Sequence, residues 1–245
     1  MDHESLASVV AAAKGFLARE PLLHGLINNA GVMATPHAIT GDGYEEQWQT
    51  NYLAHWVFTE HLLPRMLQTS KDLPAGSVRI VNLTSSGHYF APNGGISFAD
   101  TALANETPVT RYGQSKLANV LHVKTLDRLY GPRSSSAQSG EGEIWTAAVH
   151  PGLVESQLGR RAEFPALIRP VLPIILALGQ VDGDTGSWTS VFCAASGDMT
   201  SEQSGTYFQR IAKPGWQSGF AKNLELAEKL EVWTRKCMKE GGWLG

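Results

Sequence analysis

The sequence predicts an α/β fold in which one parallel sheet has helices on both of its faces. Three observations support this prediction. The chain has 245 residues, of which 42% are hydrophobic and 18% are charged, and this is the composition of an ordinary globular protein with a substantial core. Short apolar runs alternate with longer segments of helical periodicity, as is typical of βαβ units. The chain contains no internal repeat, and its length is enough for one large domain or two small ones.

The expected strands are apolar, β-rich runs that stop at polar or Gly/Pro turns. They are residues 22–31, 77–85, 143–152 and 205–209. The intervening segments carry apolar residues at helical spacing and predict helices over 4–19, 44–68, 111–130, 185–195 and 224–239. The Ser/Gly-rich stretch 131–143 is expected to be a surface loop.

Polar turns follow three of the expected strands, at residues 28–31, 84–86 and 151–152. In an open sheet of parallel strands, the functional site lies beyond the carboxyl ends of the strands. We therefore expect these three turns to converge at one edge of the sheet.

Charge and composition exclude several kinds of site. The formal net charge of −3 gives no reason to expect nucleic acid as a partner. Cys193 and Cys237 cannot form a disulfide framework, and the eight histidines lack HxH and HxxxH spacing, so no metal site is expected. The first residues lack the apolar stretch of a signal peptide. The most apolar window, residues 164–179, is too short for a transmembrane helix and is interpreted as a buried or substrate-facing segment, with a membrane-surface element as the alternative.

Tyr112 and Lys116 stand four residues apart in the stretch RYGQSKLAN, on an expected helix. Residues at this spacing share one side of a helix, so the phenol and the ammonium are expected to lie side by side. A free phenol titrates at about pH 10, and a nearby cation lowers that pKa toward the working range. A tyrosine in this state can protonate a developing alkoxide or deprotonate an alcohol. Alone the pair is a weak signal, because an amphipathic ring beside a solvated lysine has the same spacing.

Two further polar residues can reach the same crevice. Ser85 ends an expected strand and can hold a substrate oxygen by a hydrogen bond. Asn51 lies within an expected helix, where asparagine is a mediocre helix former, and an inward-facing amide there could bind a water and pass protons. A capping or locally bonded role is the alternative for each residue.

Five motifs occur in a fixed order along the chain: NNAG (28–31), the asparagine of QTNYLAHW (49–56), VNLTSS (81–86), YGQSK (112–116) and HPGLVES (150–156). Together they resemble the short-chain dehydrogenase/reductase family, most closely its retinol-dehydrogenase-like and WW-domain-oxidoreductase-like members. The resemblance extends from Asp2 to the last expected helix and so implies a single domain over residues 1–245. It implies a Rossmann-like, doubly wound parallel sheet and hydride transfer between a nicotinamide and a carbonyl or alcohol carbon.

The resemblance also implies roles for individual residues. Tyr112 matches the family's acid/base, and Lys116 matches the lysine that lowers the pKa of the tyrosine and binds the nicotinamide ribose. Ser85, rather than Ser86, matches the serine that polarises the carbonyl. Asn51 matches the fourth catalytic residue, which holds a proton-relay water.

The cofactor-binding residues are implied in the same way. Tyr112 and Lys116 are expected to contact the nicotinamide half of the cofactor. Further positions match residues near the adenosine half, namely Asp2, Asn28, Ala30 and Gly31, or residues near the nicotinamide, namely Pro151, Gly152, Val154 and Ser156. NADP is the expected cofactor, with NAD as the alternative, although no residue of this chain decides between them.

The chain departs from the family pattern at its start, because no TGxxxGxG motif precedes residues 26–31. The family's glycines let the backbone reach the pyrophosphate at a helix N-terminus. We therefore expect an N-terminally truncated fold that lacks the first two βαβ units, on the order of 60 residues, and an open edge on the strand that ends at Asn28. Three explanations are open: an incomplete sequence of an active enzyme, a short isoform with impaired or no activity, or a second chain that supplies the missing strands.

The family binds its substrate at the segment that here spans about residues 157–184. Its Leu, Ile, Val and Pro residues suit a hydrophobic carbonyl or alcohol compound, although they could equally pack against the sheet. Tyr89 and Phe90 could also line this pocket. The enzyme is expected to be cytoplasmic and to act in secondary metabolism.

Two classes of function other than an enzyme are open. A catalytically impaired chain could act as a binding or dimerising module through its long helices, or as a scaffold in a biosynthetic complex. The Trp and Leu positions of residues 44–68 are interpreted as core or as a helix–helix dimer face, so a homodimer is possible. Residues 226–236 are interpreted as a surface amphipathic helix with Glu/Lys pairs.

Overall fold

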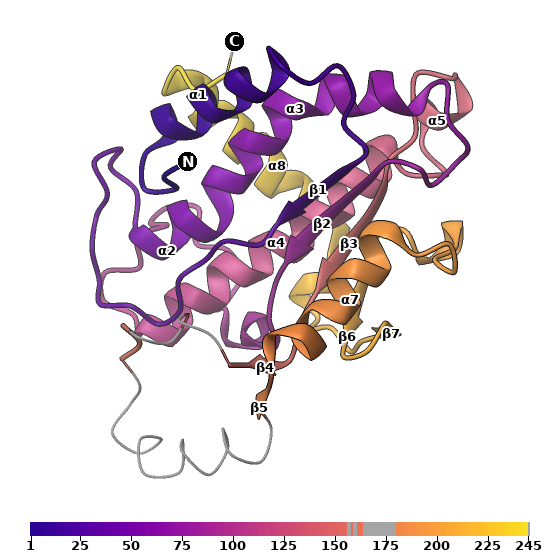
Figure 1. The fold of residues 1–245 in the computed structure, drawn as a ribbon. Coiled ribbons are helices and arrows are strands. Elements are labelled where there is room, and N and C mark those ends of the chain that lie inside the picture. The colour runs from indigo at the N-terminus through magenta and orange to yellow at the C-terminus, as the bar shows by residue number, and fades with distance from the viewer. Residues whose placement is uncertain (156–157, 159–160, 164–179, 245) are drawn as a thin grey trace.

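The structure is a computed structural model that describes residues 1–155, 158, 161–163 and 180–244 (Figure 1). Its main sheet has the strand order β1-β2-β3-β6-β7. Strands β1 (Gly25–Asn28), β2 (Arg79–Leu83), β3 (Trp145–Val149) and β6 (Thr206–Gln209) are parallel, and β7 (Lys213–Pro214) pairs antiparallel with β6. The predicted parallel α/β fold and its four strands are therefore confirmed.

Helices cover both faces of this sheet (Figure 1). One face carries α3 (Ala54–Ser70) and α4 (Pro108–Tyr130), with α1 (Leu6–Leu17) packed on α3, and the other face carries α7 (Gly183–Ala195). The helix that ends in α3 begins as α2 (Glu46–Trp48) and passes through a π-helical turn, η1 (Gln49–Leu53). Helix α8 (Leu224–Glu240) ends the chain. All five predicted helices are thus present, with ends that shift by a few residues.

Capping residues explain where two of these helices start. The side chain of Thr107 accepts a hydrogen bond from the backbone N–H of Thr110 at 3.1 Å, and Pro108 occupies the first turn of α4. At α7 the carboxylate of Asp182 accepts from the N–H of Thr185 at 2.8 Å. These caps fix the helices that lie on opposite faces of the sheet.

The buried side chains form cores on both faces of the sheet. Alternation along β2 sends Ile80 toward α3 and Val81 toward α7, because successive side chains of a strand point to opposite faces. On the α7 side, Val81 joins Leu83, Trp145, Ala147, Val149, Cys193 and Phe208. All five residues of β2 and of β3 are buried, as expected for parallel strands that have helices on both faces.

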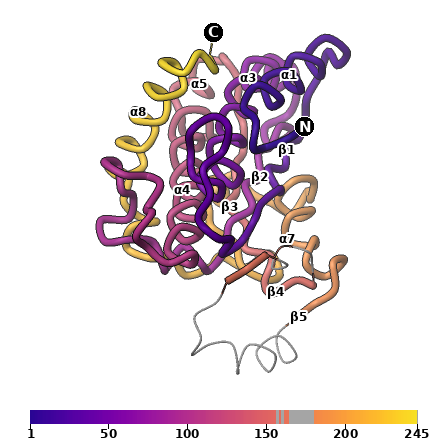
Figure 2. The backbone as a smooth tube through the Cα atoms, turned by 90° about the vertical axis from the view of Figure 1, so that its left-hand side faces the viewer, coloured from indigo at the N-terminus to yellow at the C-terminus, as the bar shows by residue number. Residues whose placement is uncertain are grey.

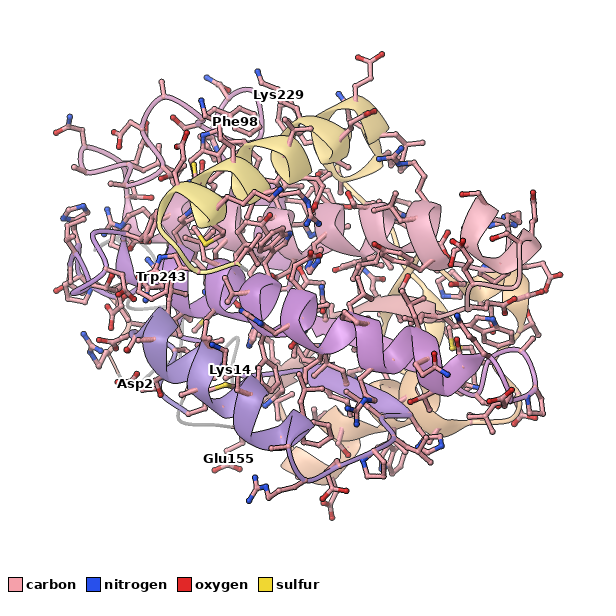
Figure 3. The ribbon with its side chains drawn as sticks, turned by 90° about the horizontal axis from the view of Figure 1, so that it is seen from above. Asp2, Lys14, Phe98, Glu155, Lys229 and Trp243 are labelled. Atoms are coloured by element: carbon pink, nitrogen blue, oxygen red, sulfur yellow. The ribbon has the colours of Figure 1, made fainter. Side chains whose placement is uncertain are left out.

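Helix α8 lies along α4 on the outside of the helical layer (Figure 2). It buries Leu230 in the same cluster as Trp48, Tyr52 and Trp56, and these three aromatic side chains are at most 1% exposed. The interpretation of residues 44–68 as core is therefore confirmed, and the alternative that these rings form a dimer face is wrong. Figure 3 shows Phe98, from the segment before α4, next to Lys229 of α8, whose Nζ is 4.5 Å from the ring centroid.

The remaining elements are short and were not predicted. They are η2 (Ser86–Phe90), α5 (Ser135–Gln138), β4 (Leu153–Val154), β5 (Gln180–Val181), η4 (Ser201–Gln203), β7 and η5 (Phe220–Lys222). The expectation of a plain loop over 131–143 is corrected by α5, which the side chain of Ser134 caps. Most of the predicted substrate segment 157–184, including the apolar window 164–179, lies outside the described residues.

The edge strand β1 and the apolar character of the helices bear on what the protein can contact. Among the described residues, β1 pairs only with β2, so the expected open edge on this strand is confirmed. Ile27 of β1 is 44% exposed. In the described part of the chain, none of the helices has the length and apolar character needed to span a bilayer.

Candidate active site

The carboxyl ends of β1 and β2 meet helix α4 at Lys116. The ammonium Nζ of Lys116 donates to the carbonyl oxygen of Leu83 at 3.1 Å, and the Thr84 hydroxyl donates to the Lys116 carbonyl oxygen at 2.7 Å. A Cβ built on Gly31, in the turn after β1, would lie 3.5 Å from that Nζ. The end of β3 is joined to the same place, because the N–H of Thr84 donates to the carbonyl oxygen of Val149 at 2.8 Å. The predicted convergence of the polar turns is therefore confirmed.

Tyr112 lies one turn before Lys116 on α4, and its side chain is only 5% exposed. Its ring packs against Gly87, since a Cβ built on that glycine would be 2.7 Å from the ring atom Cε1 and 3.4 Å from Oγ of Ser85. Nζ of Lys116 is 5.7 Å from the centroid of the same ring. The structure thus brings Ser85, Tyr112 and Lys116 together, whereas Ser86 is exposed.

Burial sets the protonation of this pair. It raises the pKa of Tyr112 to about 12, while a hydrogen bond with the Ser85 side chain acts in the opposite direction. Burial also lowers the pKa of Lys116 to about 8. The lysine was expected to lower the pKa of the phenol, and this prediction is wrong. The pKa of Tyr112 is raised instead, because its loss of hydration outweighs the attraction of the nearby ammonium. At neutral pH the phenol is protonated and can donate a proton.

Asn51 lies within the π-helical turn η1 and is fully buried. Its Oδ1 accepts from the N–H of Val32 at 2.8 Å, and its Nδ2 donates to the Val32 carbonyl oxygen and to Oγ of Ser115, both at 2.9 Å. Both N–H groups of the amide are therefore used. The inward orientation is as expected, but the amide fastens the turn after β1 to α4 and keeps no N–H for a water. The backbone carbonyl oxygen of Asn51 lies 3.0 Å from Nδ1 of His55.

The residues expected near the adenosine half differ in their accessibility. Asn28 is buried, and its Nδ2 donates to Thr59 and Asn82 at 3.0 and 2.8 Å, so its amide ties β1 to α3 and β2. Ala30 and Gly31 are half-buried and remain accessible from the site. Asp2 is exposed at the start of α1, and its carboxylate accepts from the N–H of Glu4 at 2.9 Å (Figure 3).

The segment after β3 runs along the other side of the site. Pro151 and Gly152 are half-buried, and Gly152 has φ +92° with Arg210 so close that a Cβ would be 2.6 Å from its Cδ. Only glycine suits this backbone conformation and this approach. Val154 lies in β4 against Gly186 of α7. Ser156 lies outside the described residues.

The groups around Lys116 fit a nicotinamide ribose. An ammonium has three N–H donors, and within the described part of the chain Nζ of Lys116 has Leu83 as its hydrogen-bond acceptor. Two donors remain for hydroxyl groups of a sugar beside the half-buried Gly31. Lys116, Tyr112 and the 30–31 turn could therefore hold the ribose and nicotinamide, while contacts of Gly152 and Val154 with the nicotinamide stay a prediction.

Two residues that the sequence analysis did not select support this site. Ser115 is fully buried, and its hydroxyl donates to the Tyr112 carbonyl oxygen at 2.8 Å while it accepts from Asn51. Nδ1 of His88 lies 2.7 Å from the Ser85 carbonyl oxygen, and the N–H of Ser218 donates to its Nε2 at 3.2 Å. Both stand three residues after a selected residue, and this spacing within helical turns was the available signal.

Comparisons with known proteins agree with this architecture. No family model matches the chain. Over 242 residues it is 46% identical to the short-chain dehydrogenase/reductase drtF of Aspergillus calidoustus, covering 98% of this chain and 76% of that protein. Over 241 residues it is 36% identical to human retinol dehydrogenase 12, and the match covers 97% of this chain and 67% of that protein. Its fold is similar to that of an NADPH-bound carbonyl reductase from chicken fatty liver, with a TM-score of 0.54 and 20% sequence identity. The match covers 85% of this chain and 72% of the reductase chain.

Proposed function

Because the chain belongs to the short-chain dehydrogenase/reductase family, we propose that it transfers a hydride between NADP(H) or NAD(H) and a carbonyl or alcohol group of a hydrophobic small molecule. The observation that carries this proposal is the approach of the Tyr112 ring to Gly87 beside Ser85, with Lys116 at the end of β2. This arrangement places a proton donor, a hydroxyl and a cation at the carboxyl ends of parallel strands. The cytoplasmic setting and a role in secondary metabolism stay predictions.

Each residue has one task in this proposal. Ser85 donates a hydrogen bond from Oγ to the substrate oxygen and so stabilises the negative charge that develops there. Tyr112 gives its phenolic proton to that oxygen in reduction and takes it back in oxidation. Lys116 holds sugar hydroxyls with its free N–H donors. When bound, the nicotinamide supplies or accepts the hydride.

The protonation of Tyr112 supports reduction as the favoured direction at neutral pH. With a pKa of about 12 the phenol keeps its proton at pH 7, and a reduction needs a proton donor at the substrate oxygen. Oxidation of an alcohol needs the phenolate, so it should require higher pH.

A substitution of the phenol tests the assignment directly. In Tyr112→Phe we expect kcat/KM for carbonyl reduction to fall at least about 100-fold, because general acid catalysis contributes factors of this size or more. The matched control is Tyr130→Phe, at the other end of α4, which should keep wild-type activity. Circular dichroism should show the same fold in both variants. Full activity of Tyr112→Phe would refute the role of the phenol.

One observation favours a second candidate function. Among the described residues the outer edge of β1 has no strand partner, and the backbone N–H and C=O groups of such an edge can pair with a strand of another chain. This supports a binding module without catalysis. Titration with NADPH, followed by nicotinamide fluorescence, separates the two, since binding at micromolar concentration supports the oxidoreductase and no binding at millimolar concentration supports the module.

A further inference from the structure

Two buried polar atoms close to the site lack a hydrogen-bond partner among the described residues. They are the hydroxyl oxygen of Tyr207 and Nδ1 of His150. A buried polar group left unpaired costs about 1–3 kcal/mol, so native proteins keep few of them without a reason. Neither atom has a task in the hydride transfer proposed above.

The two side chains lie on one face of the sheet, since Tyr207 is the second residue of β6 and His150 directly follows the neighbouring strand β3. Strands β3 and β6 are parallel, with Ala148 opposite Tyr207. Because side chains alternate along a strand, His150 shares the face of Ala148 and hence that of Tyr207. Ala148 and Tyr207 pack in the cluster that contains Leu117 of α4, so this is the face that α4 covers. Tyr112 is carried by the same helix.

His88 connects Tyr207 to the catalytic serine. The ring centroids of Tyr207 and His88 are 5.1 Å apart, and Nδ1 of His88 is 2.7 Å from the carbonyl oxygen of Ser85. Charge on Tyr89 or Tyr112 would raise the pKa of Tyr207 further, which reflects how near these phenols lie. One ring thus separates the unpaired hydroxyl from the turn that carries Ser85.

The segment 213–219, which begins with β7, packs against Tyr207 and His88. The N–H of Gly215 donates to the Tyr207 carbonyl oxygen at 2.8 Å, and a Cβ on Gly215 would be 2.9 Å from Cδ1 of the ring. Trp216 of the same segment is 85% exposed, whereas Oε1 of Gln217 is buried without a partner in the described part of the chain. The amide of Gln209 lies near the Tyr207 hydroxyl but does not reach hydrogen-bond geometry. Since Tyr207 is fully buried, a ligand reaches its hydroxyl only when a covering segment, such as this one, shifts.

We propose that Tyr207 and His150 form a second polar subsite, which binds a hydroxyl group of the substrate at a distance from the carbonyl that Ser85 and Tyr112 bind. The substrate class is then a hydroxylated, otherwise apolar ketone, or the corresponding alcohol. A ligand hydroxyl both accepts and donates, so it can accept from the phenol and donate to the imidazole nitrogen or to Gln217. The assignment of the ketone end rests on the proposed function.

The charge of the subsite favours a neutral group. Burial lowers the pKa of His150 to about 4, so the imidazole is uncharged at neutral pH. Burial also keeps the Tyr207 hydroxyl protonated. The neutral phenol and imidazole supply no charge to offset the loss of hydration of a ligand carboxylate, whereas a hydroxyl needs none.

The test compares 1-tetralone with its 5-, 6- and 7-hydroxy derivatives, whose binding to the full chain is measured by isothermal titration calorimetry. A site that hydrogen-bonds a hydroxyl discriminates against the analogue that lacks it. We expect the wild type to bind at least one hydroxylated isomer about tenfold or more tightly than 1-tetralone. Tyr207→Phe should remove this preference and leave the affinity for 1-tetralone unchanged, and Tyr130→Phe should keep it.

Several results would overturn the subsite. Equal binding of all four ketones by the wild type would do so, as would binding of none of them. A loss of affinity for 1-tetralone and its hydroxylated isomers alike in Tyr207→Phe would show that the phenol only supports the fold.

Turnover with NADPH separates this inference from the proposed function. If the wild type prefers a hydroxylated isomer but reduces none of the ketones, the proposed function fails and the subsite stands. If it reduces all four with equal kcat/KM, the function stands and the subsite fails.

Discussion

The ring of Tyr112 lies directly against Gly87. A Cβ built on Gly87 would be 2.7 Å from Cε1 and 2.9 Å from Cδ1 of the ring, and real Cβ atoms essentially never show contacts below 3.0 Å. The absence of a side chain at this position therefore lets the phenol lie beside Ser85, whose Oγ is 3.4 Å from the Cβ built on Gly87.

Gly87→Ala is expected to displace the phenol. Because small misplacements of a reacting group can cost two orders of magnitude in rate, kcat/KM should fall about 100-fold. Overpacking should also lower the free energy of unfolding by about 1–3 kcal/mol. The variant is assayed for carbonyl reduction and unfolded in urea beside the wild type.

The matched control for this substitution is Gly15→Ala. No atom lies within 4 Å of a Cβ at Gly15, which is in the interior of α1. Alanine there should raise the free energy of unfolding by about 0.5–1 kcal/mol and leave activity unchanged. Wild-type kcat/KM in Gly87→Ala would contradict the role given to this contact.

Lys116 should make stability depend on pH. Its pKa is about 8 in the folded chain and 10.5 in an unfolded one, so between these values the unfolded chain binds more protons and stability rises with pH. Below pH 8 the buried charge costs about 3 kcal/mol, at about 1.4 kcal/mol for each pKa unit. The hydrogen bond to Leu83 offsets about 1 kcal/mol of this.

Lys116→Met is therefore expected to be more stable than the wild type at pH 7, by about 2 kcal/mol. This advantage should shrink by about 1.4 kcal/mol per pH unit between pH 8 and pH 10. Denaturation in urea at each pH measures it. Lys236→Met is the control, because the Lys236 side chain is 71% exposed, and its difference from the wild type should not vary with pH. A constant advantage for Lys116→Met would show that the lysine is not desolvated.

The sequence predicted the relation of Tyr112 to Lys116 well, because two residues on one helix are placed by helical geometry alone. The protonation of the pair was not predictable from their spacing. It depends on burial, which α4 acquires only when it packs on β2 and η2. The contact of Tyr112 with Gly87 joins an α-helix to a 3₁₀ turn, and no local pattern encodes such a contact.

The same reasoning separates the strands from Asn51. Strand positions followed from apolar runs that end at turns, so Asn28 was placed correctly at a strand end, whereas β2 ends at Leu83 and Ser85 caps η2 two residues later. Asn51 was selected as a functional residue, but its partners, Val32 and Ser115, come from two other elements. Only the packed structure shows which of its atoms are occupied.

The Asn51 amide is expected to stabilise the fold through these partners. Asn51→Ala leaves the N–H and the carbonyl of Val32 and the Ser115 hydroxyl without their partner, and should lower the free energy of unfolding by about 3 kcal/mol. Ser115→Ala removes one of the three bonds and also the hydrogen bond that the Ser115 hydroxyl donates to the Tyr112 carbonyl oxygen, and should cost about 2 kcal/mol. In the double variant the losses should not add, with a coupling of about 1 kcal/mol, since the residues share a hydrogen bond. Additive losses would argue against a clamp between η1 and α4.

Helix α8 offers a matched pair of residues that tests whether it belongs to the core. Leu230 is 1% exposed and packs with Trp48, Tyr52 and Trp56, whereas Val232, two residues later, is 64% exposed. Leu230→Ala should lower the free energy of unfolding by about 2–4 kcal/mol, because it removes buried apolar atoms and leaves a cavity. Val232→Ala should change it by less than about 0.5 kcal/mol. Urea denaturation of both variants measures the difference. Equally small effects would mean that α8 does not cover the aromatic cluster, and the three rings would then again be available as a contact face between two copies of the chain.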